Sequence, residues 1–261
     1  MTFDKQKRAV LPWLGGKSRL APQIIEMIDQ RKHTAYVEVF AGAAHVLFRK
    51  SESKSETIND INGELINLYR VIQHHLEEFV RHFKWALIAR EEFNRLKASN
   101  PETLTDIQRA SRFFYLQKLT FAGKLGASYG TSTTGAPRFN LLRIEEDLSQ
   151  AHLRLSRVNI ERLDWAECIR RYDRPHTLFY VDPPYYGCEG DYEKDIFSRS
   201  DFEVLSSMLR LIKGDFILSL NDHPAVRDIF AWCDLKSVSL NYSASKGATT
   251  KAKELLITPK T

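Results

Sequence analysis

The chain has 261 residues, of which 43% are hydrophobic and 27% are charged, and its formal net charge is +5 at pH 7. These values are typical of a globular protein with a sizeable core and exclude a fibrous or low-complexity chain. No apolar run approaches the length of a membrane span, the N-terminus lacks a signal-peptide pattern, and the three cysteines are scattered. We therefore expect a cytoplasmic protein with neither a disulfide framework nor a zinc site. The basic excess weakly favours a polyanionic partner.

Hydrophobic spacing predicts helices and strands that alternate at both ends of the chain. The expected helices lie over 17–29, 43–50, 64–97 (two or more) and a region that Thr105 could cap. The expected strands lie over 35–40, 57–60, 158–162, 178–182, 216–220, 235–240 and 255–257. This order predicts the α/β class, with a doubly wound sheet and a mainly helical insertion.

The most specific motif is Asp182-Pro183-Pro184-Tyr185, at the end of the expected strand 178–182. Prolines cannot continue a central strand, so they fix a turn just beyond the sheet, where open α/β sheets bind ligands. The motif suits a planar base with an exocyclic amine: Asp182 and the Pro183 carbonyl accept its hydrogens, and Tyr185 stacks on its ring. The alternative is an ordinary strand exit, because Asp-Pro is common in turns, but these four residues together are far more specific.

This motif resembles the catalytic signature of amino-methylating DNA methyltransferases. Four further segments, in the family's order, narrow the resemblance to the Dam-like adenine methyltransferases: Pro12–Lys17, Val37–Ala44, Asn59–Asn62 and Lys253–Thr258. Residues 70–150 resemble the family only loosely. The resemblance implies a Rossmann-like methyltransferase sheet, S-adenosylmethionine as cofactor, and catalysis by Asp182, Pro183, Pro184 and Tyr185.

By the same resemblance, the enzyme would methylate the N6 amine of adenine in double-stranded DNA after the base has left the helix. Three alternatives remain open: the N4 amine of cytosine, adenine in RNA, and a DNA-binding relative without activity. Neither a metal nor a covalent nucleophile is required. The target sequence and the pairing with a restriction nuclease do not follow from the residues.

The cofactor residues are also implied by the resemblance. Phe40 would pack near the adenosine, Gly42 would permit a close approach, and Lys17 could pair with the methionine carboxylate. The full expected set is Trp13, Gly16, Lys17, Glu38, Phe40, Gly42, Asp60, Asp164 and Asp182. The family usually has a second glycine where this chain has Ala44, and the methyl group is tolerated if the backbone keeps a negative φ there.

Two of these carboxylates have a second interpretation. Asp60 follows the second strand, where doubly wound folds bind a ribose diol, but it could instead cap the helix that begins near Gly63. We favour the ribose. Asp164 resembles the family's acceptor for the cofactor adenine, and a helix cap is equally compatible with its position.

Residues 109–143 contain six basic residues and no acidic one. A glycine- and hydroxyl-rich loop within this stretch would let the backbone approach phosphates. We predict DNA contacts from Lys124, Tyr129, Arg138 and Asn140, whereas Phe113, Phe114 and Leu116 are expected in the core of an amphipathic helix. If those contacts are absent, the stretch is a solvated face.

These observations predict a catalytic domain over 1–68 and 150–261 and a target-recognition domain over 69–149. The expected partner is double-stranded DNA, with no membrane and no metal, and the expected state is a monomer.

Overall fold

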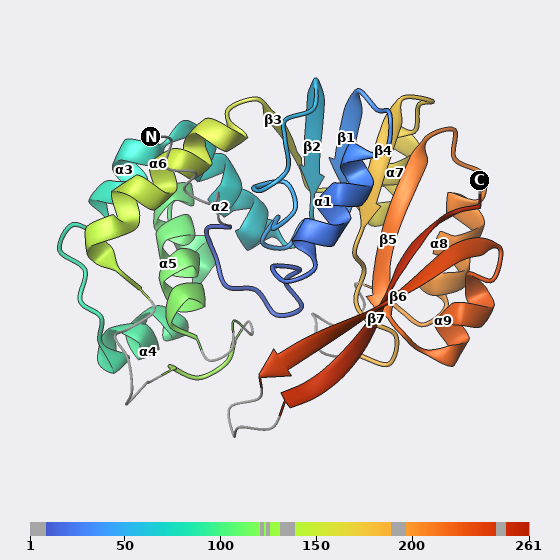
Figure 1. The fold of residues 1–261 in the computed structure, drawn as a ribbon. Coiled ribbons are helices and arrows are strands. Elements are labelled where there is room, and N and C mark those ends of the chain that lie inside the picture. The colour runs from blue at the N-terminus through green and yellow to red at the C-terminus, as the bar shows by residue number, and fades with distance from the viewer. Residues whose placement is uncertain are drawn as a thin grey trace, which may run out of the picture. The chain divides into compact units, whose positions relative to one another are not determined.

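The computed structural model describes residues 9–120, 123, 126–130, 139–188, 197–243 and 249–260. The chain forms two compact units, and its N-terminal third contributes separate segments to each of them (Figure 1). The first unit comprises Met1–Lys17, Gly42–Lys50 and Asn62–Arg162. The second unit comprises Ser18–Ala41, Ser51–Ile61 and Leu163–Thr261. None of the described helices is long and apolar enough to cross a bilayer.

The first unit is mainly helical. Its elements are α2 (Gly63–His74), α3 (Leu76–Arg81), α4 (Arg90–Ala98), η1 (Pro101–Thr103), α5 (Asp106–Leu119), η3 (Leu141–Arg143), α6 (Ile144–Leu155) and strand β3 (Val158–Glu161). The predicted cap of α5 is confirmed: Thr105 Oγ1 accepts from the Gln108 amide, and the Thr105 amide donates to Gln108 Oε1 at 3.0 Å. This capping box satisfies two amides that the first turn would otherwise leave without partners.

Aromatic rings form the core of the first unit. Phe114 on α5 lies edge-on to Phe79 and Phe139, with ring centroids 5.5 and 5.6 Å apart, and Phe83 joins the same cluster. Phe113 is buried as well, whereas Leu116 is half-buried. The prediction of a core role is thus confirmed for the two phenylalanines of α5.

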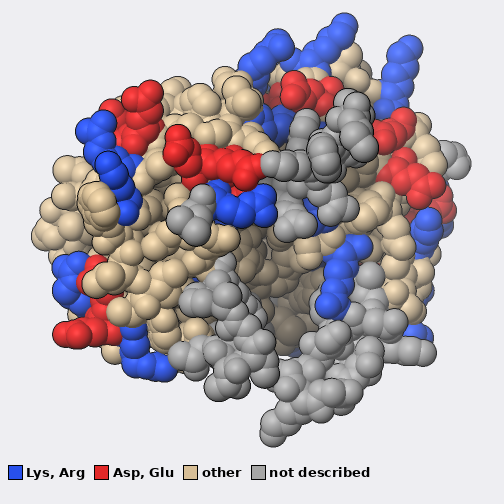
Figure 2. All heavy atoms as spheres, turned by 60° about the vertical axis from the view of Figure 1, so that its left-hand side comes forward, with Lys and Arg blue, Asp and Glu red and all other residues tan. Residues whose placement is uncertain are grey.

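Charged side chains of both signs are spread over the surface. Among the coloured atoms of Figure 2, acidic and basic groups are interspersed rather than gathered into one field. Exposed ion pairs within helices include Arg95 with Glu92 in α4 and Arg171 with Glu167 in the helix over Trp165–Tyr172. Such exposed pairs contribute little to stability. The net positive charge is instead expected to affect the association of the protein with charged partners.

The second unit holds a twisted sheet with helices on both faces (Figure 1). Its elements are α1 (Ala21–Asp29), β1 (Ala35–Glu38), β2 (Ser55–Asn59), α7 (Trp165–Tyr172), β4 (Thr177–Val181), α8 (Asp201–Leu209), β5 (Asp215–Asn221), α9 (Pro224–Ile229), β6 (Cys233–Ser243) and β7 (Thr249–Pro259). Within this unit the strand order is β2-β1-β4-β5-β7-β6. The first four of these strands are parallel and β7 is antiparallel to both of its neighbours. The predicted α/β class is confirmed.

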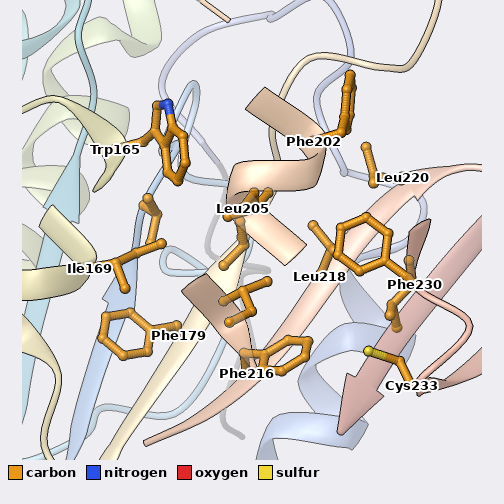
Figure 3. Packing of buried hydrophobic residues seen from close by; sticks show 14 of the residues in the cluster. Trp165, Ile169, Phe179, Phe202, Leu205, Phe216, Leu218, Leu220, Phe230 and Cys233 are labelled. Carbon is orange, nitrogen blue, oxygen red and sulfur yellow. The ribbon is translucent and has the colours of Figure 1, made fainter. Parts of the chain in front are cut away.

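One face of this sheet carries the apolar core. Alternate residues of β4 and β5 point into it, including Phe179, Phe216 and Leu218, and they meet Ile169 of α7 and Leu205 of α8 (Figure 3). Because side chains alternate along a strand, the residues between them lie on the opposite face. That face carries the polar side chains described below.

The expected helix over 43–50 is wrong. The segment forms hydrogen-bonded turns, in which Phe48 N donates to Ala44 O and Lys50 N donates to Val46 O. Ala44 has a φ of +49°, which is incompatible with a right-handed helix. The other expected helices and strands are present, with ends shifted by a few residues.

Candidate functional site

Asp182 directly follows β4, and its carboxylate is held from the neighbouring strand. The Ser219 hydroxyl on β5 donates to Oδ1 of Asp182 at 2.8 Å. Strand β4 lies between β1 and β5, and all three are parallel, so their carboxyl ends meet at one edge of the sheet. Pro183 and Pro184 are buried, whereas Asp182 and Tyr185 are half-buried. The motif is therefore anchored through its prolines and presents a carboxylate and a ring at this edge.

The chain after the motif is fixed to the end of β5. The Tyr186 amide donates to Oδ1 of Asn221 at 2.9 Å, and Nδ2 of Asn221 donates back to the Tyr186 carbonyl at 3.0 Å. A turn follows, in which Cys188 N donates to Tyr185 O at 2.9 Å and Gly187 has a φ of +83°. Glycine suits this turn because only glycine adopts such a φ without steric cost.

Buried polar groups line the sheet face beside Asp182. The Tyr36 hydroxyl donates to Oε1 of Glu38 at 2.8 Å, and the hydroxyls of Tyr180 and Ser219 lie 2.9 Å apart. Burial, reinforced by nearby carboxylates, raises the pKa of Tyr36 and Tyr180 well above 10.0, so both remain protonated at neutral pH. Glu38, one of the predicted cofactor residues, is only 1% exposed.

An aromatic cluster stands at the end of β1. The Phe40 ring is stacked with Trp165 at a centroid distance of 6.5 Å and lies edge-on to Phe197 at 5.7 Å. Trp165 and Phe197 are buried and Phe40 is half-buried. The exposed part of such a cluster is an apolar surface suited to a nucleoside, as predicted for Phe40.

Asn59, at the end of β2, ties three segments of this edge together. Its Nδ2 donates to the Val39 carbonyl at 3.0 Å and to the Leu163 carbonyl at 3.1 Å. The Leu163 amide donates back to Oδ1 of Asn59 at 2.8 Å. The side chain therefore fixes the exits of β1 and β2 and the residue before Asp164.

The alternative role of Asp60 as a helix cap is wrong. Helix α2 begins at Gly63, and its cap is Asn62, whose Oδ1 accepts from the Leu65 amide at 3.0 Å. Asp60 lies two residues earlier, directly after β2, and is half-buried. Its position is the one from which doubly wound folds bind a ribose diol.

For Asp164 the helix cap is confirmed. Its Oδ1 accepts from the amides of Ala166 at 2.9 Å and Glu167 at 3.3 Å, at the start of α7. Both bonds end on the same oxygen, and the residue is exposed. The second carboxylate oxygen leaves a place for an amine donor, so the cap and the predicted adenine contact are compatible.

Trp13 and Gly42 pack together in the first unit. A Cβ added to Gly42 would lie 2.8 Å from the Trp13 indole nitrogen, and the φ of Gly42 is +47°. The Gly42 carbonyl accepts from the Tyr69 hydroxyl at 2.6 Å. Glycine is thus required at position 42 by the positive φ and by the indole that lies against it. These two reasons are independent of the close approach predicted for the cofactor.

The condition expected at Ala44 is not met. Ala44 is 1% exposed and has the positive φ that the family's second glycine would supply without strain. For a residue with a Cβ this conformation costs about 1–2 kcal/mol. Ala44 therefore has the backbone conformation that is typical of glycine, and its methyl group makes this conformation less stable than it would be for glycine.

Gly16 lies against a half-buried histidine, His45. A Cβ on Gly16 would lie 2.7 Å from Nε2 of His45, so glycine leaves room for the imidazole. Desolvation, followed by the charges of Arg49 and Lys17, lowers the pKa of His45 to about 4. Lys17 is 6% exposed and donates to the Gly15 carbonyl at 3.1 Å. A buried ammonium group is a suitable partner for a cofactor carboxylate.

Most of the basic residues in 109–143 serve the first unit itself. Arg109 pairs with Glu64, Arg112 Nε donates to the Leu96 carbonyl at 2.7 Å, and Arg143 lies 3.4 Å from Glu146. Lys118 lies over the Phe114 ring, and burial lowers its pKa. These contacts orient helices and leave Lys124 and Arg138 as the remaining cations of the stretch; both lie outside the described residues.

Of the other two predicted DNA residues, Tyr129 packs at the end of α4. Its ring lies edge-on to Phe93 at 5.4 Å, the Arg90 guanidinium lies 4.9 Å over it, and its backbone bridges to Thr120. Asn140 is exposed, next to the buried Phe139. The structure therefore gives Tyr129 a packing role and places Asn140 at the surface.

Three site residues were missed from the sequence: Asn59, Ser219 and Asn221. Ser219 and Asn221 interrupt the otherwise apolar run Phe216-Ile-Leu-Ser-Leu-Asn221, whereas Asn59 ends the mostly polar but buried strand Ser55-Glu-Thr-Ile-Asn59. Buried polar groups must be hydrogen-bonded, so their presence in these strands was the available signal. Their partners are set by sheet pairing and cannot be read from spacing.

Comparison with known proteins gives consistent matches over most of the chain. A family model described as D12 class N6 adenine-specific DNA methyltransferase matches residues 13–243. The DNA adenine methylase of Escherichia coli K12 is 31% identical, and the alignment covers 95% of this chain and 93% of that protein. The type II methyltransferase M.CviBI of Paramecium bursaria Chlorella virus NC1A is 22% identical over 85% of this chain and 86% of its own length. The type II methyltransferase M1.LlaDCHI of Lactococcus lactis is 23% identical, with coverages of 96% and 95%. The matched range includes all of the predicted catalytic, cofactor and DNA residues.

Proposed function

Because the chain belongs to the D12 class of N6 adenine-specific DNA methyltransferases, we propose that Asp182 is the residue that orients the adenine amine for methylation. The observation that carries this assignment is the placement of its carboxylate at the carboxyl edge of the sheet, where Ser219 fixes one oxygen. Family membership favours adenine in DNA over the N4 amine of cytosine or adenine in RNA.

The amine of adenine is a poor nucleophile because its lone pair is delocalised into the ring. In the proposed mechanism, Asp182 and the Pro183 carbonyl accept the two amine hydrogens and localise the lone pair, and Tyr185 stacks on the base. Asp182 also stabilises the positive charge that develops on the nitrogen, without first removing a proton. The target base must leave the duplex to reach this edge, because its amine is otherwise paired and stacked.

Enzymes of this class use S-adenosylmethionine, which supplies an electrophilic methyl group on sulfonium sulfur. Residues within each unit fit parts of such a group: the second unit has an aromatic surface at Phe40 and a carboxylate at Asp60 after β2, and the first unit has the buried Lys17. We assign Phe40 and Asp164 to the adenine, Asp60 to the ribose and Lys17 to the methionine carboxylate. By the family resemblance, we also assign Trp13, Gly16, Glu38 and Gly42 to the cofactor.

Target recognition is assigned to residues 69–149, and catalysis to 1–68 and 150–261. The support for this division is that the helical middle of the chain carries the acid-free basic stretch. In this proposal the protein acts as a monomer on double-stranded DNA, through Lys124, Tyr129, Arg138 and Asn140.

A methyl-transfer assay tests the role of Asp182. Purified protein, labelled S-adenosylmethionine and duplex DNA of mixed sequence should yield N6-methyladenine, identified by mass spectrometry of the nucleosides. The Asp182→Ala variant should lose about a hundredfold to a thousandfold in turnover, the range for removal of one preorganised hydrogen-bonding group.

The matched control is Asp234→Ala, which removes an exposed aspartate on β6. This variant should methylate DNA as the wild type does. The role assigned to Asp182 is wrong if Asp182→Ala retains more than about a tenth of wild-type turnover. Methylcytosine as the product would overturn the choice of base.

A further inference from the structure

Three side chains form a continuous hydrogen-bonded chain that ends on the Asp182 carboxylate. The hydroxyls of Tyr180 and Ser219 lie 2.9 Å apart, and the Ser219 hydroxyl lies 2.8 Å from Oδ1 of Asp182. Tyr180 is on β4 and Ser219 is on β5, so the chain crosses between two neighbouring strands of one unit. Ser219 is 0% exposed and Tyr180 is 3% exposed, which shields these bonds from competing water.

The direction of the chain follows from the chemistry of its groups. An ionised carboxylate only accepts hydrogen bonds, so the single hydroxyl hydrogen of Ser219 must point to Asp182. Ser219 Oγ is then an acceptor toward Tyr180, and the tyrosine must donate. Tyr180 keeps its proton, because burial and the Asp182 charge raise its pKa well above 10.0. Each donor polarises the next, which strengthens the final bond to the carboxylate.

The same face of β5 also fixes the chain after the motif. Asn221 lies two residues beyond Ser219, so the two side chains point to the same face of the sheet. Asn221 exchanges two hydrogen bonds with the backbone of Tyr186, immediately after the Asp-Pro-Pro-Tyr motif. Strand β5 therefore contacts the motif at two points, first at its carboxylate and then at its exit.

We propose that Ser219 is a positioning residue: with Tyr180 donating to it, Ser219 holds Oδ1 of Asp182 so that Oδ2 is presented to the adenine amine. This inference rests on the role proposed for Asp182. Rotation of the carboxylate about its bond to Cβ moves both oxygens and would turn the acceptor away from the amine, and the bond from Ser219 opposes that rotation. The effect belongs to the methyl-transfer step, not to cofactor binding.

The test compares Ser219→Ala with Ser206→Ala. Ser206 is an equally suitable buried serine of the same unit, which donates to the Ile229 carbonyl and accepts from Trp232. Ser219→Ala should lower kcat by about tenfold to a hundredfold, the range for losing a hydrogen bond to a charged group, while KM for DNA and Kd for S-adenosylmethionine stay within about twofold. Ser206→Ala should leave kcat unchanged, even if it lowers the melting temperature by as much as Ser219→Ala does.

A double-mutant cycle with Tyr180→Phe tests the chain itself. Tyr180→Phe should lower kcat by a few-fold in the wild type and have no further effect in the Ser219→Ala background. Ser219→Thr, which keeps the hydroxyl, should recover most of the lost turnover. If Ser219→Thr does not fold, the cycle alone decides, because both of its variants only remove an oxygen atom.

The inference is overturned if Ser219→Ala has the same kcat as Ser206→Ala while Asp182→Ala is inactive. Additive effects of Ser219→Ala and Tyr180→Phe would overturn the chain as a connected unit. If the wild-type protein methylates no adenine, or Asp182→Ala remains active, the proposed function fails instead, so the two failures are distinguishable.

Discussion

At the scale of single residues, the segment Gly42–Lys50 departs most from its expected conformation. Hydrophobic spacing predicts a helix over 43–50, but the left-handed φ of Ala44 ends any helix at its second residue. An alanine at this φ is rare because of its Cβ, so the sequence favours the wrong backbone. The positive φ of Ala44 is visible only in the folded structure.

His45, the next residue, should make the stability of the protein depend on pH. Its pKa is about 4 in the folded protein and 6.5 in the unfolded chain, because burial and the cations Arg49 and Lys17 disfavour the imidazolium form. The unfolded state therefore binds more protons below pH 6.5, and the stabilisation that is present above pH 6.5 is lost as the pH falls toward 4. At 1.36 kcal/mol per pH unit, the loss is at most about 3 kcal/mol.

Denaturant unfolding of the wild type and of His45→Gln across this pH range measures the effect. The variant should show a flatter profile, since glutamine does not titrate. His74→Gln, at an exposed position in α2, is the control and should keep the wild-type slope. Equal slopes for all three proteins would contradict the assignment to His45.

At the scale of elements, the start of α2 decides which of two neighbouring polar residues caps the helix. Asn62 caps the helix, whereas Asp60 directly follows β2. Both belong to the segment Asn59-Asp-Ile-Asn62, and each has a side chain that can cap. The hydrogen bond from the Leu65 amide assigns the cap to Asn62, so a cap no longer competes with the ribose role proposed for Asp60.

We expect the two alanine variants to affect different properties of the protein. Asn62→Ala should lower the free energy of unfolding by about 1 kcal/mol and leave cofactor affinity unchanged. Asp60→Ala should weaken S-adenosylmethionine binding by about 1.5–3 kcal/mol, with a smaller effect on stability. Calorimetric titration beside a melting curve measures both quantities. The ribose assignment is wrong if Asp60→Ala binds the cofactor as tightly as the wild type.

At the scale of the whole molecule, the net charge of +5 does not by itself show which basic residues contact DNA. Arg109, Arg112, Lys118 and Arg143 are engaged within the first unit, by ion pairs, carbonyls or an aromatic ring. Among the basic residues of the stretch, the prediction of DNA contacts therefore rests on Lys124, within the glycine- and hydroxyl-rich loop, and on Arg138, just beyond it.

These two residues should affect DNA binding in different ways. Lys124→Ala should lower the salt slope of binding by about one and leave sequence preference unchanged, because a phosphate contact carries no sequence information. Arg138→Ala should relax the preference at one position by about 1–3 kcal/mol, because a planar guanidinium can read a guanine edge. Titration against target and scrambled duplexes at several salt concentrations measures both effects, with Arg112→Ala as a control for loss of an internally bonded cation. If neither variant changes affinity, slope or preference, the stretch is a solvated face.

The sequence by itself determined the features that depend on local pattern. The α/β class, the approximate position of each described strand, the cap at Thr105 and the position of Asp182 at the end of β4 follow from hydrophobic period, capping preference and the fixed geometry of proline. The family followed from motifs that keep their order along the chain.

The tertiary structure decided everything that depends on partners distant in sequence. Asn59 and Leu163 are 104 residues apart, Asp182 and Ser219 are 37 apart, and only the pairing of strands brings them within hydrogen-bonding distance. The φ of Ala44 and the cap at Asn62 were likewise ambiguous, because a small or polar side chain is compatible with several backbones until packing selects one. Local pattern places a residue on an element, whereas the function of its side chain depends on which atoms the fold places beside it.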